Sequence, residues 1–263
     1  MKMIKELKED SPIILGLSGR AGSGKTSVAE KLVPKGSIDV SIGGIKWDHI
    51  FYALPLYELS SIKRSIKGLN QKNRQLYAIH DVLYDLYGRS ALGKIPEYHD
   101  LFNRVMSIHG LPIEPEGTKP RTFLQQAGDI CRDGFEDCFA EWAISKSNKM
   151  YSSYRKSIPE DEIVSPYVVI ISDVRFVNEA EKILQQPNGI VISFDASEEV
   201  LNDRIMRRDG QVLTKEQASH KSEQQIEDIF KISTYTIDTT LMSIEDQVSA
   251  TLDCVGLIKE HNA

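Results

Sequence analysis

The sequence predicts an α/β fold in which a parallel β-sheet carries helices on both faces, a three-layer arrangement. The prediction rests on three short apolar runs, at residues 13–17, 167–171 and 190–194. Each run is continuous rather than alternating, which is typical of strands buried on both faces. Each is followed by a segment with the apolar spacing of a helix, and strands that alternate with helices favour a parallel, doubly wound sheet.

Weaker signals extend this sheet at both ends of the chain. A further strand is expected near residues 38–42. Another is expected at residues 235–237, followed by a helix at about 243–255.

The middle of the chain predicts helices rather than strands. Strand signals are few before the run at 167–171, and apolar residues between 76 and 86 recur at helical spacing. We therefore expect a single domain over residues 1–263 with a mainly helical insertion at about 45–150. The polar stretch at 145–165 is expected to form a surface connection back to the sheet.

Composition excludes several classes of protein. Hydrophobic residues make up 41% of the 263 residues and charged residues 27%, which fits a globular protein and neither a fibrous nor a wholly disordered one. The 32 Lys and Arg against 38 Asp and Glu leave a net charge of -6, which argues against nucleic acid or an acidic membrane as the main partner. Only three cysteines occur, without metal-binding spacing, so a zinc site is not expected. The chain shows neither a signal peptide nor an apolar run long enough to span a bilayer, so we expect a cytoplasmic protein.

Residues 19–26 read GRAGSGKT and match G-x-x-x-x-G-K-[ST], the P-loop pattern, between a predicted strand and a predicted helix. Glycines let successive backbone N–H groups surround a phosphate, and the helix N-terminus adds its positive dipole. Lys25 is expected to reach the β and γ phosphates of a nucleoside triphosphate, and the Thr26 hydroxyl to bind magnesium. The alternative is a structural glycine turn. The residues expected to bind the nucleotide here are Gly19, Gly22, Ser23, Gly24, Lys25 and Thr26.

A second polar segment follows the run at 167–171. Asp173 and Arg175 stand at the expected carboxyl end of that strand, where ligands collect in open parallel sheets. Asp173 is a candidate ligand of magnesium or its water shell, and Arg175 a candidate contact of a transferred phosphoryl group. The alternative is a helix N-cap aspartate beside a surface arginine.

A third segment holds three arginines within five residues, Arg204, Arg207 and Arg208, at the end of the helix expected after the run at 190–194. Arginines that close over phosphates stabilise the charge of a phosphoryl-transfer transition state. Together with the polar residues that follow, they predict a lid at about 204–225. The alternative is a solvated helix end, where cations are favoured by the helix dipole.

A fourth segment carries Arg121, Gln125, Asp129 and Arg132, which are three or four residues apart and share one face of a helix. An arginine clamp suits a monophosphate, and an amide suits the edge of a nucleobase. From the spacing alone, a solvated amphipathic helix is the alternative.

Together these motifs resemble the bacteriophage-type deoxynucleoside monophosphate kinases, within the P-loop nucleoside monophosphate kinases. The family order is a P-loop, an F-A-x-P-L segment, an R-x-x-L-Q-x-x-G helix ending in Arg with Trp further on, and D-x-R-F-x-N-E. The matching residues are 19–26, 52–56, Arg121 with Leu124, Gln125, Gly128, Arg132 and Trp142, and 173–176 with Asn178 and Glu179. Arg204 and Arg208 are similar to lid arginines of the wider superfamily, and residues 220–223 to a short motif after the lid.

This resemblance implies a phosphotransferase that uses Mg²⁺ and ATP as the phosphoryl donor. It implies that Lys25, Arg175 and Arg208 contact the phosphates during transfer and that Arg204 and Arg208 close over ATP. The implied substrate-binding residues are Arg121, Gln125, Arg132, Asp173 and Arg175, and the implied magnesium ligands are Thr26 and Asp173. A homodimer and, for a phage-encoded chain, the host cytoplasm are the implied setting.

Two departures from the family pattern lie on the acceptor side. Tyr57 stands where the family often has Lys, and the stretch from about 60 to 120 is long.

The leading hypothesis is transfer of the γ-phosphoryl group of Mg-ATP to a deoxynucleoside 5′-monophosphate. Two alternatives remain open at the level of the sequence. The first is a P-loop kinase for another phosphorylated acceptor such as phosphomevalonate, against which Gln125 favours a nucleotide. The second is a regulatory P-loop ATPase that binds a partner through the helical insertion.

Overall fold

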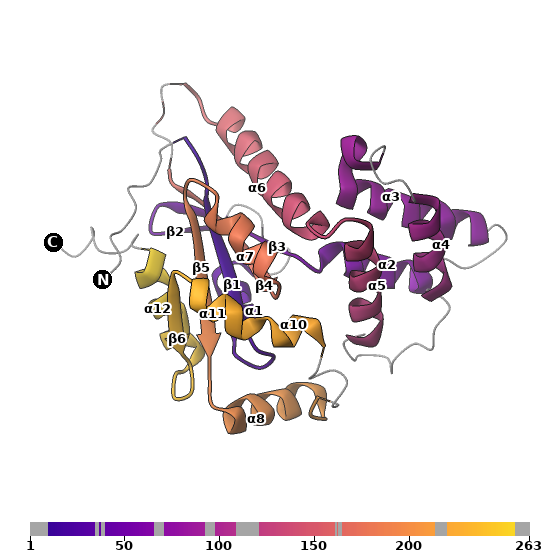
Figure 1. The fold of residues 1–263 in the computed structure, drawn as a ribbon. Helices are drawn as coiled ribbons and strands as arrows, with labels where there is room; N and C mark the ends of the chain where they lie inside the picture. The colour runs from indigo at the N-terminus through magenta and orange to yellow at the C-terminus, as the bar shows by residue number, and fades with distance from the viewer. Residues whose placement is uncertain are drawn as a thin grey trace.

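A computed structural model describes residues 10–34, 37, 40–65, 71–92, 98–108, 121–160, 162, 165–213 and 220–255. Its centre is a six-stranded sheet in the order β2-β3-β4-β1-β5-β6, parallel except for the antiparallel β2–β3 pair (Figure 1). The strands are β1 (Ile13–Gly19), β2 (Val40–Ile42), β3 (Ile45–Phe51), β4 (Tyr167–Val174), β5 (Gly189–Asp195) and β6 (Tyr235–Asp238).

Helices cover both faces of the sheet, which confirms the predicted α/β architecture. On one face lie α1 (Lys25–Leu32) and α12 (Ile244–Val255). On the other lie α6 (Cys138–Ser157), α7 (Val177–Leu184) and α11 (Ile226–Ile232). Among the described helices, none is both long and apolar enough to cross a membrane.

Four further helices form a lobe beside the sheet (Figure 1). They are α2 (Leu54–Ser65), α3 (Gln71–Leu92), α4 (Tyr98–Ile108) and α5 (Arg121–Gly134). Of the described helices, α8 (Glu198–Asp209) and α10 (Lys221–Gln224) lie toward the carboxyl ends of the strands.

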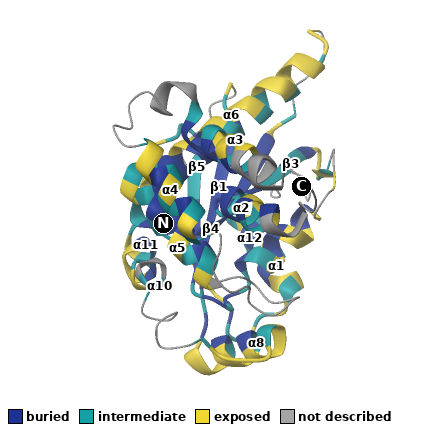
Figure 2. Cartoon of the chain, turned by 90° about the vertical axis from the view of Figure 1, so that its right-hand side faces the viewer, coloured by how far each residue is buried: buried dark blue, intermediate teal, exposed yellow. Residues whose placement is uncertain are grey.

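Burial explains why these segments form these layers. The strands of the sheet are dark with buried residues in Figure 2, while the outer faces of helices such as α8 are exposed. One apolar cluster joins β1 and β4 to α1, through residues such as Leu15 and Val28. A larger cluster joins the opposite face to the helical lobe, through residues such as Ile171, Phe139 and Leu83. The lobe therefore packs against this face of the sheet through one shared core.

The structure corrects two sequence-based expectations and confirms part of a third. The helical insertion begins at Leu54 rather than at about residue 45, because Ile45–Phe51 is β3, a strand of the sheet that pairs in parallel with β4. The expected strand at 38–42 is confirmed only from Val40, and residues 38 and 39 lie outside the described part. The stretch at 145–165 is not mainly a connection, because α6 continues to Ser157.

Candidate functional site

The loop from β1 to α1 turns back on itself around backbone that only glycine adopts easily. Gly19 has a φ of 140° and Gly22 a φ of 83°. A Cβ on Gly19 would lie 2.4 Å from the backbone oxygen of Phe194, and one on Gly22 would lie 2.8 Å from that of Leu201. Both glycines are therefore required by positive φ and by close approach of neighbouring backbone.

Lys25 is the first residue of α1 and is 4% exposed. Its Nζ lies 3.3 Å from the carbonyl oxygen of Arg20, within the same loop, and 3.7 Å from Oδ1 of Asp173 on β4. A buried lysine needs such partners, because desolvating an unpaired charge is costly. The loop and the end of β4 are thereby joined through one cation.

Asp173 owes its position to a β-bulge. Leu17 pairs with Ser172 while Ser18 pairs with Val174, so Asp173 is an extra residue in β4. It is also the one described non-glycine residue with positive φ, at 68°. The bulge turns Val174 onto the face already used by Ile171 and leaves Asp173 at the strand end, beside Lys25. The N-cap alternative for Asp173 is wrong, since Phe176 precedes the first residue of α7.

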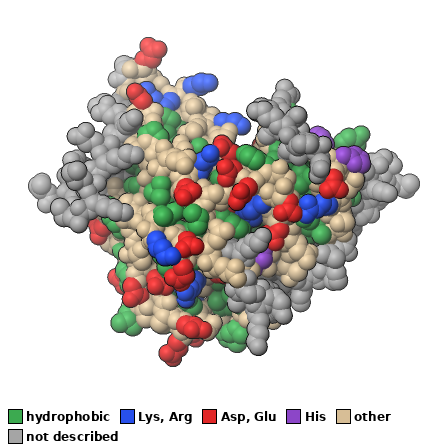
Figure 3. Space-filling model, in the orientation of Figure 1, with side chains coloured by type: hydrophobic (Ala, Val, Ile, Leu, Met, Phe, Trp, Pro, Cys, Tyr) green, Lys and Arg blue, Asp and Glu red, His purple; other side chains and the backbone are tan. Residues whose placement is uncertain are grey.

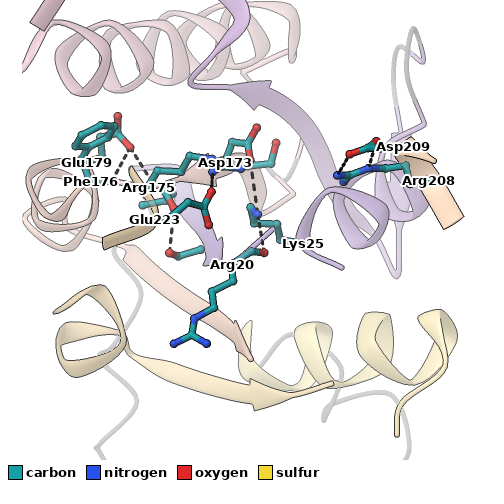
Figure 4. A network of polar contacts seen from close by, with 12 residues as sticks. Arg20, Lys25, Asp173, Arg175, Phe176, Glu179, Arg208, Asp209 and Glu223 are labelled. Atoms are coloured by element: carbon teal, nitrogen blue, oxygen red, sulfur yellow. Dashed lines mark hydrogen bonds and ion pairs between the residues drawn. The ribbon is translucent and has the colours of Figure 1, made fainter. Parts of the chain in front are cut away.

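Arg175 lies between two carboxylates. Its Nε and one terminal nitrogen lie 3.3 Å from Oδ1 of Asp173, and the other terminal nitrogen pairs with Glu223 of α10 (Figure 4). Burial disfavours its charge, but Asp173 and Glu223 outweigh burial and raise the pKa of Arg175. Arg175 therefore remains a cation.

Glu223 completes a cluster of four charges with Lys25, Asp173 and Arg175, which point toward one another in Figure 4. Burial favours its neutral form, but Arg175, Lys25 and a hydrogen bond from the backbone N–H of Ala21 outweigh burial and lower its pKa. A carboxylate thus contacts both the loop and Arg175, two groups suited to an anion.

A first pocket, of about 520 Å³, opens along the loop on the α1 side of this cluster. This volume lies within the range of small-molecule sites. Arg204 bonds to the side chain and carbonyl of Thr239, at 3.0 and 2.8 Å, while Arg208 makes two 2.8 Å bonds to Asp209. The residues expected from the sequence that line this pocket are Gly22, Gly24, Lys25, Thr26, Asp173, Arg175, Arg204 and Arg208.

A second pocket opens on the α5 side and shares Asp173 and Arg175 with the first. Gln125 and Arg132 of α5, which were expected to bind the acceptor, line it. Its walls include the aromatic side chains of Tyr52, Phe139 and Phe176. The Arg132 side chain is only 18% exposed and pairs with Glu179 at 2.9 Å, so this face of α5 is not the solvated face of the alternative reading.

Arg121, Ser23 and Asp129 were also expected at the site, but none is among the described lining residues of the two pockets. Arg121 is the first residue of α5, but its side chain lies outside the described part of the chain. Ser23 is fully buried in the loop, and its hydroxyl has no hydrogen-bond partner in the described part. Asp129, on the same helix as Gln125, contacts His220 at 3.2 Å rather than the second pocket. The expected lid at 204–225 is described except for residues 214–219.

Glu179 and Glu223 both belong to motifs of the sequence, but neither was assigned a role in the site. Glu223 lies 48 residues from Arg175 in the chain, so no local spacing signals their contact. Glu179 is the third residue of α7, a position known for backbone capping. The usual Ser or Thr is absent from the cap position, which Phe176 occupies.

The residues of the first pocket suit magnesium bound together with phosphates. Thr26 and Asp173 offer oxygen atoms on the wall of one pocket, and oxygen is the donor that Mg²⁺ prefers. Among the residues that the structure describes, no group of three or more His, Cys, Asp or Glu is placed to hold a metal. This pattern is compatible with Mg²⁺, which commonly takes one or two carboxylates and completes its shell with water and phosphate.

Comparison with known proteins adds little to this picture. No family model and no curated protein matches the chain. A solved structure titled "Crystal structure of TT1252 from Thermus thermophilus" is similar over 92% of this chain and 97% of that one, at 17% identity and a TM-score of 0.40. A similarity at this level carries no inference about function.

Proposed function

We propose that the protein transfers the γ-phosphoryl group of Mg-ATP to a deoxynucleoside 5′-monophosphate. One observation carries the proposal: two pockets, one along the glycine-rich loop and one along α5, meet at Asp173 and Arg175. A group that moves between two bound ligands must pass through the place where their pockets join. A cation stands there, flanked by Lys25 at the base of the loop.

The donor side uses the loop as a P-loop. Backbone N–H groups of the glycine-rich turn and the N-terminus of α1 bind the phosphates, with Lys25 reaching the outer ones. Arg204 and Arg208 line the same pocket and contact ATP from α8. Thr26 and Asp173 hold Mg²⁺, which when bound neutralises part of the triphosphate charge.

The acceptor side uses the pocket beneath α5. Arg132 and Arg121 hold the monophosphate, and Gln125 contacts the edge of the base. Tyr52, Phe139 and Phe176 give the pocket apolar walls suited to a flat ring. The acceptor phosphate is itself a nucleophile, so the protein needs no nucleophilic side chain; it holds the two ligands in line, and Lys25, Arg175 and Arg208 stabilise the charge of the transition state.

Charge on the surface fits a small anionic ligand better than a nucleic acid. On the face shown in Figure 3, Lys and Arg side chains are interspersed with Asp and Glu, and no broad basic patch is present among the described residues of that face. Nucleic-acid binding depends on a continuous basic surface along the phosphate backbone.

The test is an assay of ADP release with Mg-ATP against dTMP, dGMP, dCMP, dAMP, the matching ribonucleotides and phosphomevalonate. Lys25→Ala is expected to abolish turnover. Lys31→Ala is the matched control, because Lys31 lies on the same helix with a side chain 56% exposed. Fast turnover that requires a deoxynucleotide and Lys25 supports the proposal. Turnover with phosphomevalonate alone, or a slow ATP hydrolysis that ignores every acceptor, overturns it in favour of another acceptor or a regulatory ATPase.

A further inference from the structure

Glu179 is a buried carboxylate for which phosphoryl transfer has no direct use. It lies in the first turn of α7 and is 2% exposed. A carboxylate buried to this degree requires strong hydrogen-bond partners to remain charged. The side chain and the backbone oxygen of Glu179 together bond to three parts of the candidate site.

The two oxygens of this carboxylate hold different groups. Oε1 accepts a hydrogen bond from the Arg132 guanidinium at 2.9 Å. Oε2 accepts from the backbone N–H groups of Arg175 and Phe176, at 2.9 and 3.2 Å. One rigid side chain therefore links the acceptor-side arginine to the backbone of the arginine at the pocket junction.

Arg132 is further restrained by stacking. Its guanidinium carbon lies 3.6 Å from the centre of the Phe176 ring and 4.6 Å from that of Phe139. Because Glu179 also fixes the backbone of Phe176, it holds both the end of the guanidinium and the ring beneath it. A guanidinium has five N–H donors. The bond to Glu179 thus orients the group while leaving donor capacity for an anionic ligand in the pocket.

The helical lobe is tied to the same residue. The hydroxyl of Tyr52, just before α2, donates to the backbone oxygen of Glu179 at 3.2 Å. Tyr52 lines the α5-side pocket together with Arg132. Glu179 thus stands where the helical lobe, through Tyr52 and Arg132, meets the end of β4.

We infer that Glu179 is a positioning residue that sets Arg132 for the acceptor phosphate and fixes Arg175 at the point of transfer. This inference rests on the proposed function and deepens it. Glu179 then affects acceptor binding through Arg132, and it does not itself contact the donor.

The test compares Glu179→Gln with Glu181→Gln in the assay of ADP release. Glutamine keeps the size of the side chain and an oxygen for the two backbone amides, but it presents no negative charge to Arg132. We expect the KM for the deoxynucleotide to rise about 10- to 100-fold, the size of one charged hydrogen bond, with the KM for ATP nearly unchanged. Glu181 lies on the same helix and is exposed, so its variant should match the wild type.

A double-mutant cycle separates positioning from general damage. If Glu179 acts through Arg132, Glu179→Gln adds no further rise in acceptor KM once Arg132→Ala is present. The inference would be overturned if Glu179→Gln raised the acceptor KM by the same factor with and without Arg132→Ala. It would also be overturned if a folded Glu179→Gln variant had an unchanged acceptor KM. Should Glu179→Gln fail to fold, Glu179→Asp replaces it. A carboxylate one methylene shorter cannot reach Arg132 and both amides, so the same selective rise in the acceptor KM is expected. An unchanged acceptor KM in Glu179→Asp would equally overturn the inference.

The failure of this inference differs from the failure of the proposed function. A wild-type protein that transfers phosphate to none of the acceptors removes the proposed function. An active wild type whose Glu179→Gln variant behaves like Glu181→Gln removes only the positioning role.

Discussion

Replacing Gly22 with alanine should destabilise the protein more than replacing Gly44 does, although the two glycines have similar positive φ angles. Their φ angles are 83° and 75°. Gly44 lies in the two-residue turn between β2 and β3, and a Cβ there meets nothing within 4 Å. A Cβ on Gly22 meets the backbone oxygen of Leu201 at 2.8 Å and Cγ1 of Ile205 at 3.1 Å.

Because both φ angles are positive, the difference between the two variants measures the close contact at Gly22. An alanine at positive φ costs about 1–2 kcal/mol at either position. At Gly22 the contact with Leu201 involves backbone, which cannot move aside as a flexible side chain does, so overpacking adds about 1–3 kcal/mol. Gly22→Ala should therefore lower the free energy of unfolding by about 2–5 kcal/mol, against about 1–2 kcal/mol for Gly44→Ala.

Thermal and urea unfolding of the wild type and the two variants measure this difference. For a chain of this size each kcal/mol corresponds to about 2–4 °C in Tm. Because Gly22 lines the loop-side pocket, its variant should also bind ATP more weakly, whereas Gly44→Ala should bind as the wild type does. Equal destabilisation by both variants would refute the reasoning, since it would mean that α8 shifts freely to admit the methyl group.

Three further outcomes are expected. Burial lowers the pKa of His49 from 6.5 to about 4, and Asp173 only partly opposes this, so the unfolded chain binds the proton first and stability falls as pH drops from about 6.5 to 4. Between pH 7 and pH 5 the loss should be about 2 kcal/mol. Urea unfolding of His49→Gln at these two pH values should show a much smaller loss. Gln125→Ala should raise the KM for the deoxynucleotide much more than the KM for ATP, and equal effects on both would exclude the base contact. Glu223→Gln should tighten binding of tripolyphosphate about three- to ten-fold by calorimetry, because one competing carboxylate is gone. The control Glu227→Gln, which breaks an exposed ion pair, should leave this binding unchanged. Weaker binding in Glu223→Gln would show that Glu223 does not compete with phosphate.

Local sequence patterns predicted the parts of the fold that local physics determines. Continuous apolar runs indicated β1, β4 and β5 because each of these strands is buried on both faces. The glycine-rich loop was predictable for a similar reason, since its pattern combines a strand end, positive-φ positions and a helix start within eight residues. In contrast, β3 was missed because Lys46, Asp48 and His49 interrupt its apolar pattern, although it lies inside the sheet.

The rest of the site depends on contacts between distant segments. The bulge at Asp173 depends on the pairing of β4 with β1, so no sequence pattern within β4 alone predicts it. Sequence reasoning correctly expected Asp173 and Arg175 at the end of the strand. It had no means of finding that Glu223 would pair with Arg175 from an element 48 residues away.

The charge balance of the site bears on how an anion binds to a chain with a net charge of -6. Lys25 and Arg175 face Asp173 and Glu223, so the cationic centre is neutralised by carboxylates rather than open. A phosphate that enters must displace at least one of these carboxylates or arrive with a cation that neutralises it. Under the proposed function, Mg²⁺ bound with the triphosphate would supply such a cation beside Asp173. We therefore expect tripolyphosphate to bind much more weakly without Mg²⁺ than with it. This Mg²⁺ effect on affinity should be smaller in Glu223→Gln, because the second competing carboxylate is then absent. Calorimetric titrations with and without Mg²⁺ measure both differences, and a Mg²⁺ effect of the same size in the wild type and the variant would show that Glu223 does not compete with phosphate.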